Sequence, residues 1–202
     1  IRPQWKSWLA RGAFILVGFS GVGGLFFLGH LLGYPALANL LIWPGVTLAV
    51  LSATYTAFLF SQAEGRDLWQ SSLLPGHMFV QAIMAGAAAL LIAGLFFGVV
   101  TKAIVWTLGL SLLVNLLVTV GGEFAVPHGG AVAAAAAHLI THGRYKNHYR
   151  GSITFGLILP LAIVVFASAS AGALAVAGGL ALAGLFVYEW AFVMAPQQVP
   201  NS

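Results

Sequence analysis

The sequence predicts an all-α fold, a polytopic bundle of six transmembrane helices that forms one domain over residues 1–202. Two observations predict it. Hydrophobic residues make up 60% of the chain and charged residues only 6%, whereas a soluble domain carries roughly 25% charged residues. Apolar runs of roughly 19 residues or more also recur along the chain, and such runs can cross a ~30 Å hydrocarbon core at ~1.5 Å per residue.

The helix signals place the spans at about residues 12–32, 36–62, 73–99, 103–124, 151–170 and 171–195. Pro35 suits the first turn of the second span, because its missing N–H would be unpaired there. The fifth span is expected to bend at Pro160, which cannot donate to the carbonyl of Gly156. In the sixth span, small residues at i+4 spacing predict a helix-packing face, formed by Ala171, Ala175, Gly179 and Ala183.

Residues 125–150 are the longest segment outside the spans. Within them Ala131–Thr141 predicts a short helix, which is too short to cross the membrane and is expected at its surface or on a partner. The chain begins at Ile1 in a polar, Trp-rich stretch that resembles the middle of a loop. We therefore expect further residues upstream.

Most of the charge falls on one face of the membrane. Six spans alternate in direction, so the N-terminus, the loop 63–72, the segment 125–150 and the C-terminus share one side, here called side X. Seven of the eight Lys and Arg residues lie there, and only Lys102 lies opposite. The positive-inside rule then makes side X cytoplasmic.

Two acids stand near the side-X ends of apolar runs, Glu123 in the fourth span and Glu189 in the sixth. Because burying an unpaired carboxylate is costly, such residues tend to pair, to become protonated or to line a path. They are candidates for a proton path, together with His128. The alternative is that both side chains simply reach the headgroup region.

Tyr55 lies inside the second span, about two turns before the polar loop. A buried phenol usually bonds to a neighbouring helix, but it can also donate to a quinone carbonyl. A quinone head needs hydrogen-bond donors and proton carriers connected to water. Tyr55, Glu123 and His128 supply these types at one membrane depth on side X, so they form the predicted quinone site.

The residue types limit metal chemistry. The chain has no cysteine, so an iron–sulfur cluster ligated by thiolates would belong to a partner. A b-type haem needs histidines that face each other between helices, yet His30 and His77 fall at opposite membrane faces. His138 and His142 form an HxxxH pair without the carboxylate of HExxH. We expect them at an interface, with a structural metal as the alternative.

Several stretches resemble the polysulfide reductase/NrfD-like family of membrane subunits. They are SWLARGAFIL (Ser7–Leu16), ATYTAFLFSQ (Ala53–Gln62), LLPGHMF after a polar loop, then Glu123, AAAHLITHGRY (Ala135–Tyr145) and FGLILPLAI (Phe155–Ile163). The resemblance covers nearly the whole chain, and the motifs agree in order and spacing. The chain departs from the family pattern in having six spans, without the first helices, and in Ala57, which replaces the glycine of a YTGFL-like motif.

The resemblance implies a quinone/quinol-binding membrane anchor of a respiratory oxidoreductase, with menaquinone or ubiquinone as its cofactor and with no haem or iron–sulfur cluster of its own. It implies that Tyr55 is a quinone ligand. The implied partners are an iron–sulfur subunit with [4Fe–4S] clusters and a catalytic, molybdopterin-type subunit, or an alternative complex III assembly. The implied location is the inner membrane of a prokaryotic cell. Family members usually place the motif end outside the cytoplasm, whereas the charge count favours a cytoplasmic face.

A docking face on side X follows from this interpretation. Its expected residues are Arg66, Asp67, Trp69, His138, His142 and Arg144. Two alternatives remain open at this point. One is a purely structural membrane anchor, and the other is an ion or solute transporter, for which Asn115 and Pro160 are the mid-membrane features.

Overall fold

The computed structural model describes residues 4–125 and 130–200, and in these residues it is helical throughout, without a β-strand. Six helical runs are long and apolar enough to cross a membrane, which confirms the predicted all-α polytopic fold. Their bounds are Trp8–Leu31, Pro35–Phe60, Leu74–Phe97, Lys102–Glu123, Lys146–Phe166 and Ala171–Gln198. The fifth run starts at Lys146, earlier than the Gly151 expected from the sequence.

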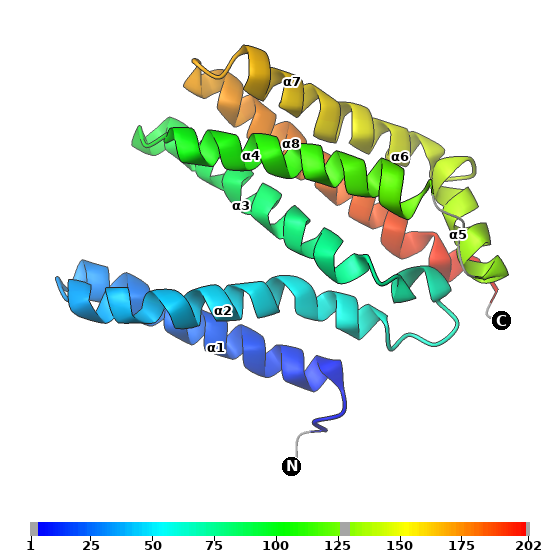
Figure 1. Cartoon of the computed structure of the whole chain (residues 1–202), viewed down its shortest axis with the longest axis horizontal. Helices are drawn as coiled ribbons and strands as arrows, with labels where there is room; N and C mark the ends of the chain where they lie inside the picture. The colour runs from blue at the N-terminus through cyan, green and yellow to red at the C-terminus, as the bar shows by residue number, and fades with distance from the viewer. Residues whose placement is uncertain (1–3, 126–129, 201–202) are drawn as a thin grey trace. The chain divides into compact units, whose positions relative to one another are not determined.

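The chain divides into two compact units, residues 1–63 and residues 64–202. We call them the N-terminal hairpin and the C-terminal bundle. The hairpin consists of α1 (Trp8–Leu31) and α2 (Pro35–Phe60), as Figure 1 shows. The bundle contains α3 to α8 together with short turns, and each unit is described by itself below.

The N-terminal hairpin is joined where α1 begins and α2 ends. The Trp8 ring stacks on Phe58 with ring centroids 4.5 Å apart, and the backbone N–H of Trp8 donates to Gln62 Oε1 at 3.0 Å. Gly12 lies against the ring of Tyr55, where a side chain on position 12 would overlap the ring carbons. The motifs at residues 7–16 and 53–62 therefore lie side by side because they pack against each other.

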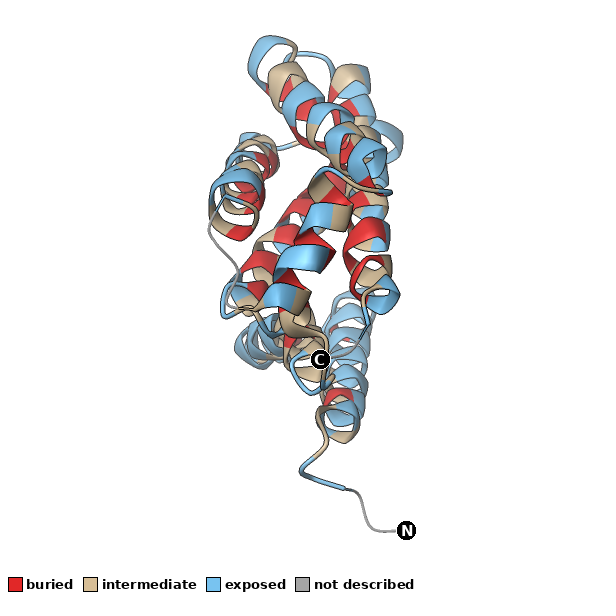
Figure 2. Ribbon diagram, turned by 90° about the vertical axis from the view of Figure 1, so that its right-hand side faces the viewer, coloured by how far each residue is buried: buried red, intermediate tan, exposed pale blue. Residues whose placement is uncertain are grey.

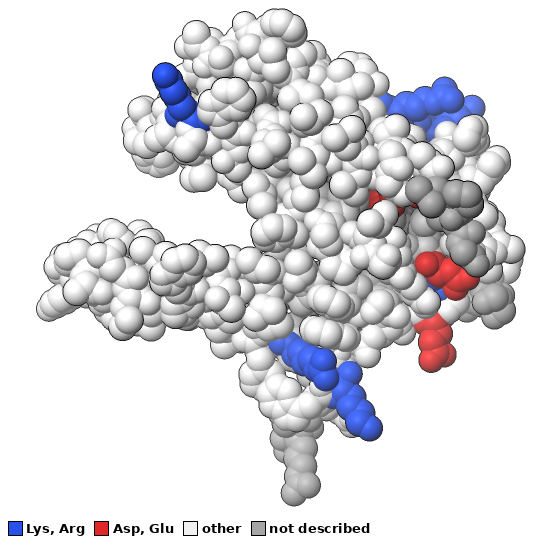
Figure 3. Space-filling view, in the orientation of Figure 1, with Lys and Arg blue, Asp and Glu red and all other residues white. Residues whose placement is uncertain are grey.

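Four helices form the core of the C-terminal bundle. They are α3 (Leu74–Phe97), α4 (Lys102–Leu117), α7 (Leu159–Phe166) and α8 (Ala171–Met194). Their buried residues lie on the sides that face one another (Figure 2), and they include Met84, Leu91, Leu108, Leu112 and Leu174. Outside this core the helix flanks on the face seen in Figure 3 carry few charges, as expected for surfaces that meet lipid.

The helix-packing face of α8 differs from the predicted ladder. Its buried small residues are Ala177, Gly178, Ala181 and Ala191, whereas Ala171, Gly179 and Ala183 are exposed in this chain. The prediction was wrong for packing inside the bundle, because two registers of small residues run along the same helix. Spacing alone could not tell which register faces α3.

Two segments of the bundle are π-helical. Val118–Glu123 extends α4 as a π-helix, and Ser152–Ile158 is a π-helix between α6 (Lys146–Gly151) and α7. The second lies immediately before Pro160, whose ring cannot donate the backbone hydrogen bond that an α-helix needs there. The bend expected at Pro160 is thus taken up as a wider turn on its N-terminal side.

Gly156, in this second π-helix, meets Gly184 of α8 backbone to backbone. A Cβ on either glycine would overlap the Cα atom of the other. Such contact without side chains lets neighbouring helices approach more closely than any other residue pair allows. It brings the π-helix Ser152–Ile158 directly onto α8.

The non-spanning segments of the bundle gather at one end. Asp67–Gln70 forms a single 3-10 turn, α5 (Ala131–Thr141) is the predicted short helix, and Pro196–Gln198 forms another 3-10 turn. These three contact one another. The alternation of spans had put the loop 63–72, the segment 125–150 and the C-terminus on one side, and the bundle agrees.

We predict that Gly184→Ala destabilises the protein by ~2 kcal/mol or more, because the added methyl group must push α8 away from the π-helix Ser152–Ile158. Thermal unfolding of the detergent-solubilised protein, followed by circular dichroism, measures the change. Gly179→Ala is the matched control, since a Cβ there meets nothing within 4 Å. Equal melting temperatures for the two variants would contradict the close contact.

Candidate functional site

A cluster of polar side chains lies inside the C-terminal bundle. His77 and Gln81 come from α3, one turn apart. Asn115, Thr119 and Glu123 follow at i+4 spacing along α4 and its π-helical extension, so they share one face. Tyr188 reaches the cluster from α8, and all six side chains are buried.

His77 and Glu123 form an ion pair at the centre of the cluster. His77 Nδ1 lies 3.0 Å from Glu123 Oε2, and the two residues are 1% and 5% exposed. The other ring nitrogen, Nε2, lies 2.7 Å from Asn115 Oδ1. An amide oxygen only accepts, so Nε2 carries a hydrogen, and one further proton is shared between Nδ1 and Oε2. With that proton on either atom the pair has no net charge.

Neighbouring groups hold this pair in place. The Tyr188 hydroxyl donates to the same carboxylate oxygen, Oε2, and its ring meets His77 edge-on, with centroids 5.6 Å apart. Thr119 Oγ1 donates to Asn115 Oδ1 at 3.3 Å. The second carboxylate oxygen, Glu123 Oε1, is buried and has no hydrogen-bond partner among the residues that the structure describes.

Glu189 joins the cluster through a single amide. Gln81 hydrogen-bonds with Glu189. Gln81 Nε2 also lies 3.3 Å from His77 Nε2, but both nitrogens carry hydrogens, so this approach is a contact and not a hydrogen bond. Glu189 follows Tyr188 on α8 and is partly buried. Both acids selected from the sequence thus lie near the same histidine. Glu123 pairs with it directly, whereas Glu189 bonds only to the neighbouring Gln81.

The three residues of the predicted quinone site are not described together. Tyr55 belongs to the N-terminal hairpin and Glu123 to the C-terminal bundle, while His128 lies outside the described residues. Tyr55 is partly buried, and its hydroxyl makes no hydrogen bond to the described residues of the N-terminal hairpin. Its ring has a structural role against Gly12. Its role as a quinone ligand stays a prediction.

The loop residues predicted to dock a partner make bonds within the bundle. The Arg66 guanidinium donates to the carbonyls of Pro196 at 2.7 Å and Val199 at 2.9 Å. The Trp69 indole donates to the Phe192 carbonyl at 3.2 Å, and Asp67 lies against Gly130. These three residues fasten the loop 63–72 to the C-terminal end of α8 and to the start of α5.

The other expected docking residues are exposed. The His138 and His142 rings stack with centroids 5.5 Å apart, and Arg144 follows in the turn before α6. Among the described residues, no third histidine, cysteine or carboxylate joins the two rings to hold a metal ion. Their docking role stays a prediction.

Sequence reasoning missed the role of His77, Gln81, Asn115, Thr119 and Tyr188. A signal was present, because polar residues at i+4 spacing follow one face of two apolar helices, at His77 and Gln81 and again from Asn115 to Glu123. A polar stripe inside a membrane span is costly unless it meets another. Pairing the two stripes would have predicted the cluster, but it would not have predicted that Tyr188 of α8 joins it.

Six apolar helical runs, together with a neutral ion pair buried in one bundle, define an integral membrane protein whose core can hold a proton. The chain belongs to the polysulphide reductase, NrfD family, because the family model matches residues 1–201. This match confirms the resemblance found in the sequence motifs. The comparison with curated proteins and the comparison with solved structures each found no match.

We predict that His77→Leu and Glu123→Leu each destabilise the bundle by ~3–5 kcal/mol, because each leaves an uncompensated buried charge or polar group. The double variant His77→Leu/Glu123→Leu should be more stable than either single variant, since it removes both partners of the pair. Unfolding of the purified protein in detergent–lipid mixtures gives the free energies. Losses that simply add in the double variant would contradict a direct pair.

Proposed function

We propose that this chain is the quinone/quinol-binding membrane anchor of a multi-subunit respiratory oxidoreductase in the inner membrane of a prokaryote. The observation that carries the proposal is the buried His77–Glu123 pair with Tyr188, in a chain of the NrfD family. Oxidising a quinol to a quinone releases two electrons and two protons. Such a subunit therefore needs a proton acceptor inside the membrane, and the pair suits that need.

The chain's residues have distinct roles in this proposal. The Tyr55 hydroxyl is free to donate to a menaquinone or ubiquinone carbonyl. Glu123 is the proton acceptor, and its Oε1 has no partner among the described residues. The positive charge then rests on His77, which the Asn115 carbonyl oxygen stabilises by accepting from Nε2. Glu189 and His128 stay candidates for the path by which the proton leaves.

The electrons require a partner with a metal centre. We propose an iron–sulfur subunit with [4Fe–4S] clusters, which connects to a catalytic, molybdopterin-type subunit. The exposed residues His138, His142 and Arg144 are its candidate contacts, on a face that the excess of Lys and Arg makes cytoplasmic. Arg66, Asp67 and Trp69 would act by keeping the loop beside that face rigid.

A purely structural anchor is the second candidate. The observation in its favour is that Arg66 and Trp69 bond to backbone carbonyls of the same bundle. Full quinol activity after the combined changes Tyr55→Phe and Glu123→Gln would favour it. The transporter alternative loses one of its two features, because Asn115 is occupied by His77 and Thr119.

Mass spectrometry and metal analysis of the gently solubilised native complex would test the class of the assembly. We expect a ferredoxin-like iron–sulfur subunit with a molybdenum or tungsten subunit. Haem-bearing partners would instead indicate an alternative complex III type of assembly. Isolation of this chain alone, without iron, would count against the proposal.

We predict that Tyr55→Phe lowers quinol turnover by roughly fivefold, because one hydrogen bond of ~1 kcal/mol to the quinone is lost while the ring still fits against Gly12. Assembly of the complex should be unchanged. Steady-state quinol oxidation by the purified complex measures the effect. Tyr34→Phe is the control, since Tyr34 is 62% exposed, and unchanged kinetics in Tyr55→Phe would refute the ligand assignment.

A further inference from the structure

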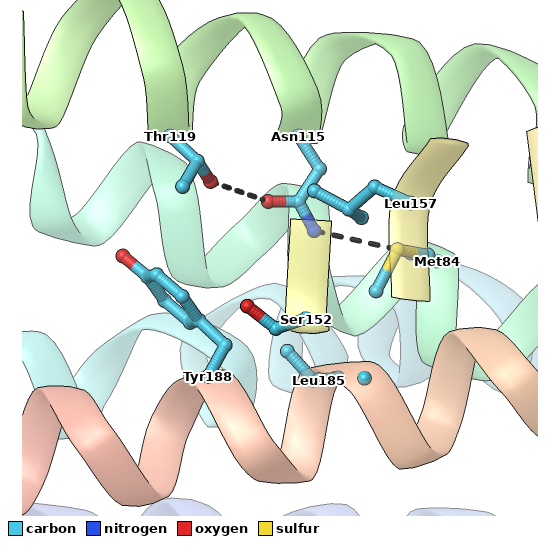
Figure 4. A pocket seen from close by; sticks show the side chains of 8 residues that line it. Met84, Asn115, Thr119, Ser152, Leu157, Leu185 and Tyr188 are labelled. Carbon is cyan, nitrogen blue, oxygen red and sulfur yellow. Dashed lines mark hydrogen bonds between the residues drawn. The ribbon is translucent and has the colours of Figure 1, made fainter. Parts of the chain in front are cut away.

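A small cavity lies beside the His77–Glu123 pair. Measured as the space open to the centre of a water molecule, it has a volume of about 10 Å³, which is about the room that one water needs. Figure 4 shows polar side chains around it, Asn115 and Thr119 on one side, Ser152 and Tyr188 on the other. Its remaining walls are Met84, Leu157, Gly184 and Leu185.

The three hydroxyl groups around the cavity already donate their hydrogens to other acceptors. Ser152 Oγ donates to the Tyr149 carbonyl at 2.8 Å, Thr119 Oγ1 donates to Asn115 Oδ1, and the Tyr188 hydroxyl donates to Glu123. A hydroxyl that has donated its hydrogen keeps lone pairs that can accept. The cavity is therefore lined by three hydroxyl oxygens with lone pairs that can accept. His77 Nε2 already lies 3.3 Å from one of them, Thr119 Oγ1.

Asn115 supplies the complementary group. Its Nδ2 carries two hydrogens, and one of them points to Met84 Sδ at 3.3 Å. The other hydrogen is left to donate. A molecule that donates twice and accepts once would match this lining, and water does so within the available volume.

We propose that the cavity binds one water molecule, which donates to two of the hydroxyl oxygens of Ser152, Thr119 and Tyr188 and accepts from Asn115 Nδ2. Both π-helical segments contribute to the site, Thr119 from one and Ser152 from the other. Such segments occur frequently at functional sites. The close contact of Gly156 with Gly184 brings the second segment onto α8, and Gly184 itself lines the cavity.

This water connects Ser152 to the carboxylate of Glu123. A proton that arrives on the water moves on when the water gives a proton to the Tyr188 oxygen while Tyr188 gives its own to Glu123. Water and phenol are left unchanged, and the carboxylate gains one proton. The same exchange run backwards releases a proton from Glu123. This relay role rests on the proposed function, whereas the water site does not.

Radiolytic footprinting of the purified full chain tests the water site directly. Hydroxyl radicals formed from a bound water oxidise the side chains around it, even where bulk solvent does not reach. We expect oxidation of Tyr188, which is only 6% exposed, and of Met84. Phe192 is an aromatic control of similar burial on the same helix. Its ring stacks on Tyr188 with centroids 6.0 Å apart, but it does not line the cavity, so it should be oxidised much less than Tyr188.

Two variants connect the signal to the proposed ligands. Ser152→Ala removes one acceptor, and the oxidation of Tyr188 should fall by about fivefold, the factor that one hydrogen bond of ~1 kcal/mol corresponds to. Ser111→Ala is the matched control, because Ser111 is also buried and bonds to its own helix, at the Leu108 carbonyl. Thr119→Val, which keeps the side-chain shape, gives a second test if Ser152→Ala fails to fold.

The outcomes separate clearly. Oxidation of Tyr188 that falls in Ser152→Ala or Thr119→Val, but not in Ser111→Ala, supports the site. Tyr188 as unreactive as Phe192 overturns it, and so does oxidation that neither variant changes. Unchanged quinol turnover in Tyr55→Phe and Glu123→Gln would remove the relay role alone, because the footprint does not depend on quinone.

Discussion

The buried pair of His77 and Glu123 is the constraint on which the C-terminal bundle depends. In lipid each buried polar group must be satisfied inside the protein, and a lone carboxylate there would be expensive. The bundle meets this demand by sharing one proton between the two residues and by surrounding them with Asn115 and Tyr188. These side-chain bonds join α3, α4 and α8. Apolar contact alone gives helices little specificity for one another in lipid.

Backbone geometry serves the same cluster. Gly156 and Gly184 permit a contact without side chains, and the π-helix that contains Gly156 also contains Ser152. Pro160 accounts for that π-helix, because it deprives the preceding turn of a donor. A sequence feature that weakens an ordinary helix thus becomes the means by which a polar side chain is brought into the core beside Tyr188.

Hydropathy was sufficient to predict the six helical runs, because lipid imposes a length and a composition on each span separately. Glu123 was also identifiable, since a lone acid in an apolar run stands out. The partners of Glu123 were not, because His77 and Tyr188 lie on other helices and their pairing depends on helix rotation. Because helix rotation was also unknown for α8, the wrong face of this helix was predicted to pack inside the bundle. Arg66 shows a third limit of sequence-based prediction. The sequence indicates a basic loop residue that could dock a partner, but it does not show that the guanidinium already donates to backbone carbonyls.

The bonds of Arg66 also bear on the order in which the protein is completed during synthesis. The arginine follows the second span, whereas its acceptors, the Pro196 and Val199 carbonyls, are 130 and 133 residues further along. The loop 63–72 therefore leaves the ribosome long before its anchor exists. It can reach its final form only after α8 has been made, so closure of this loop reports that the C-terminal end of α8 is in place.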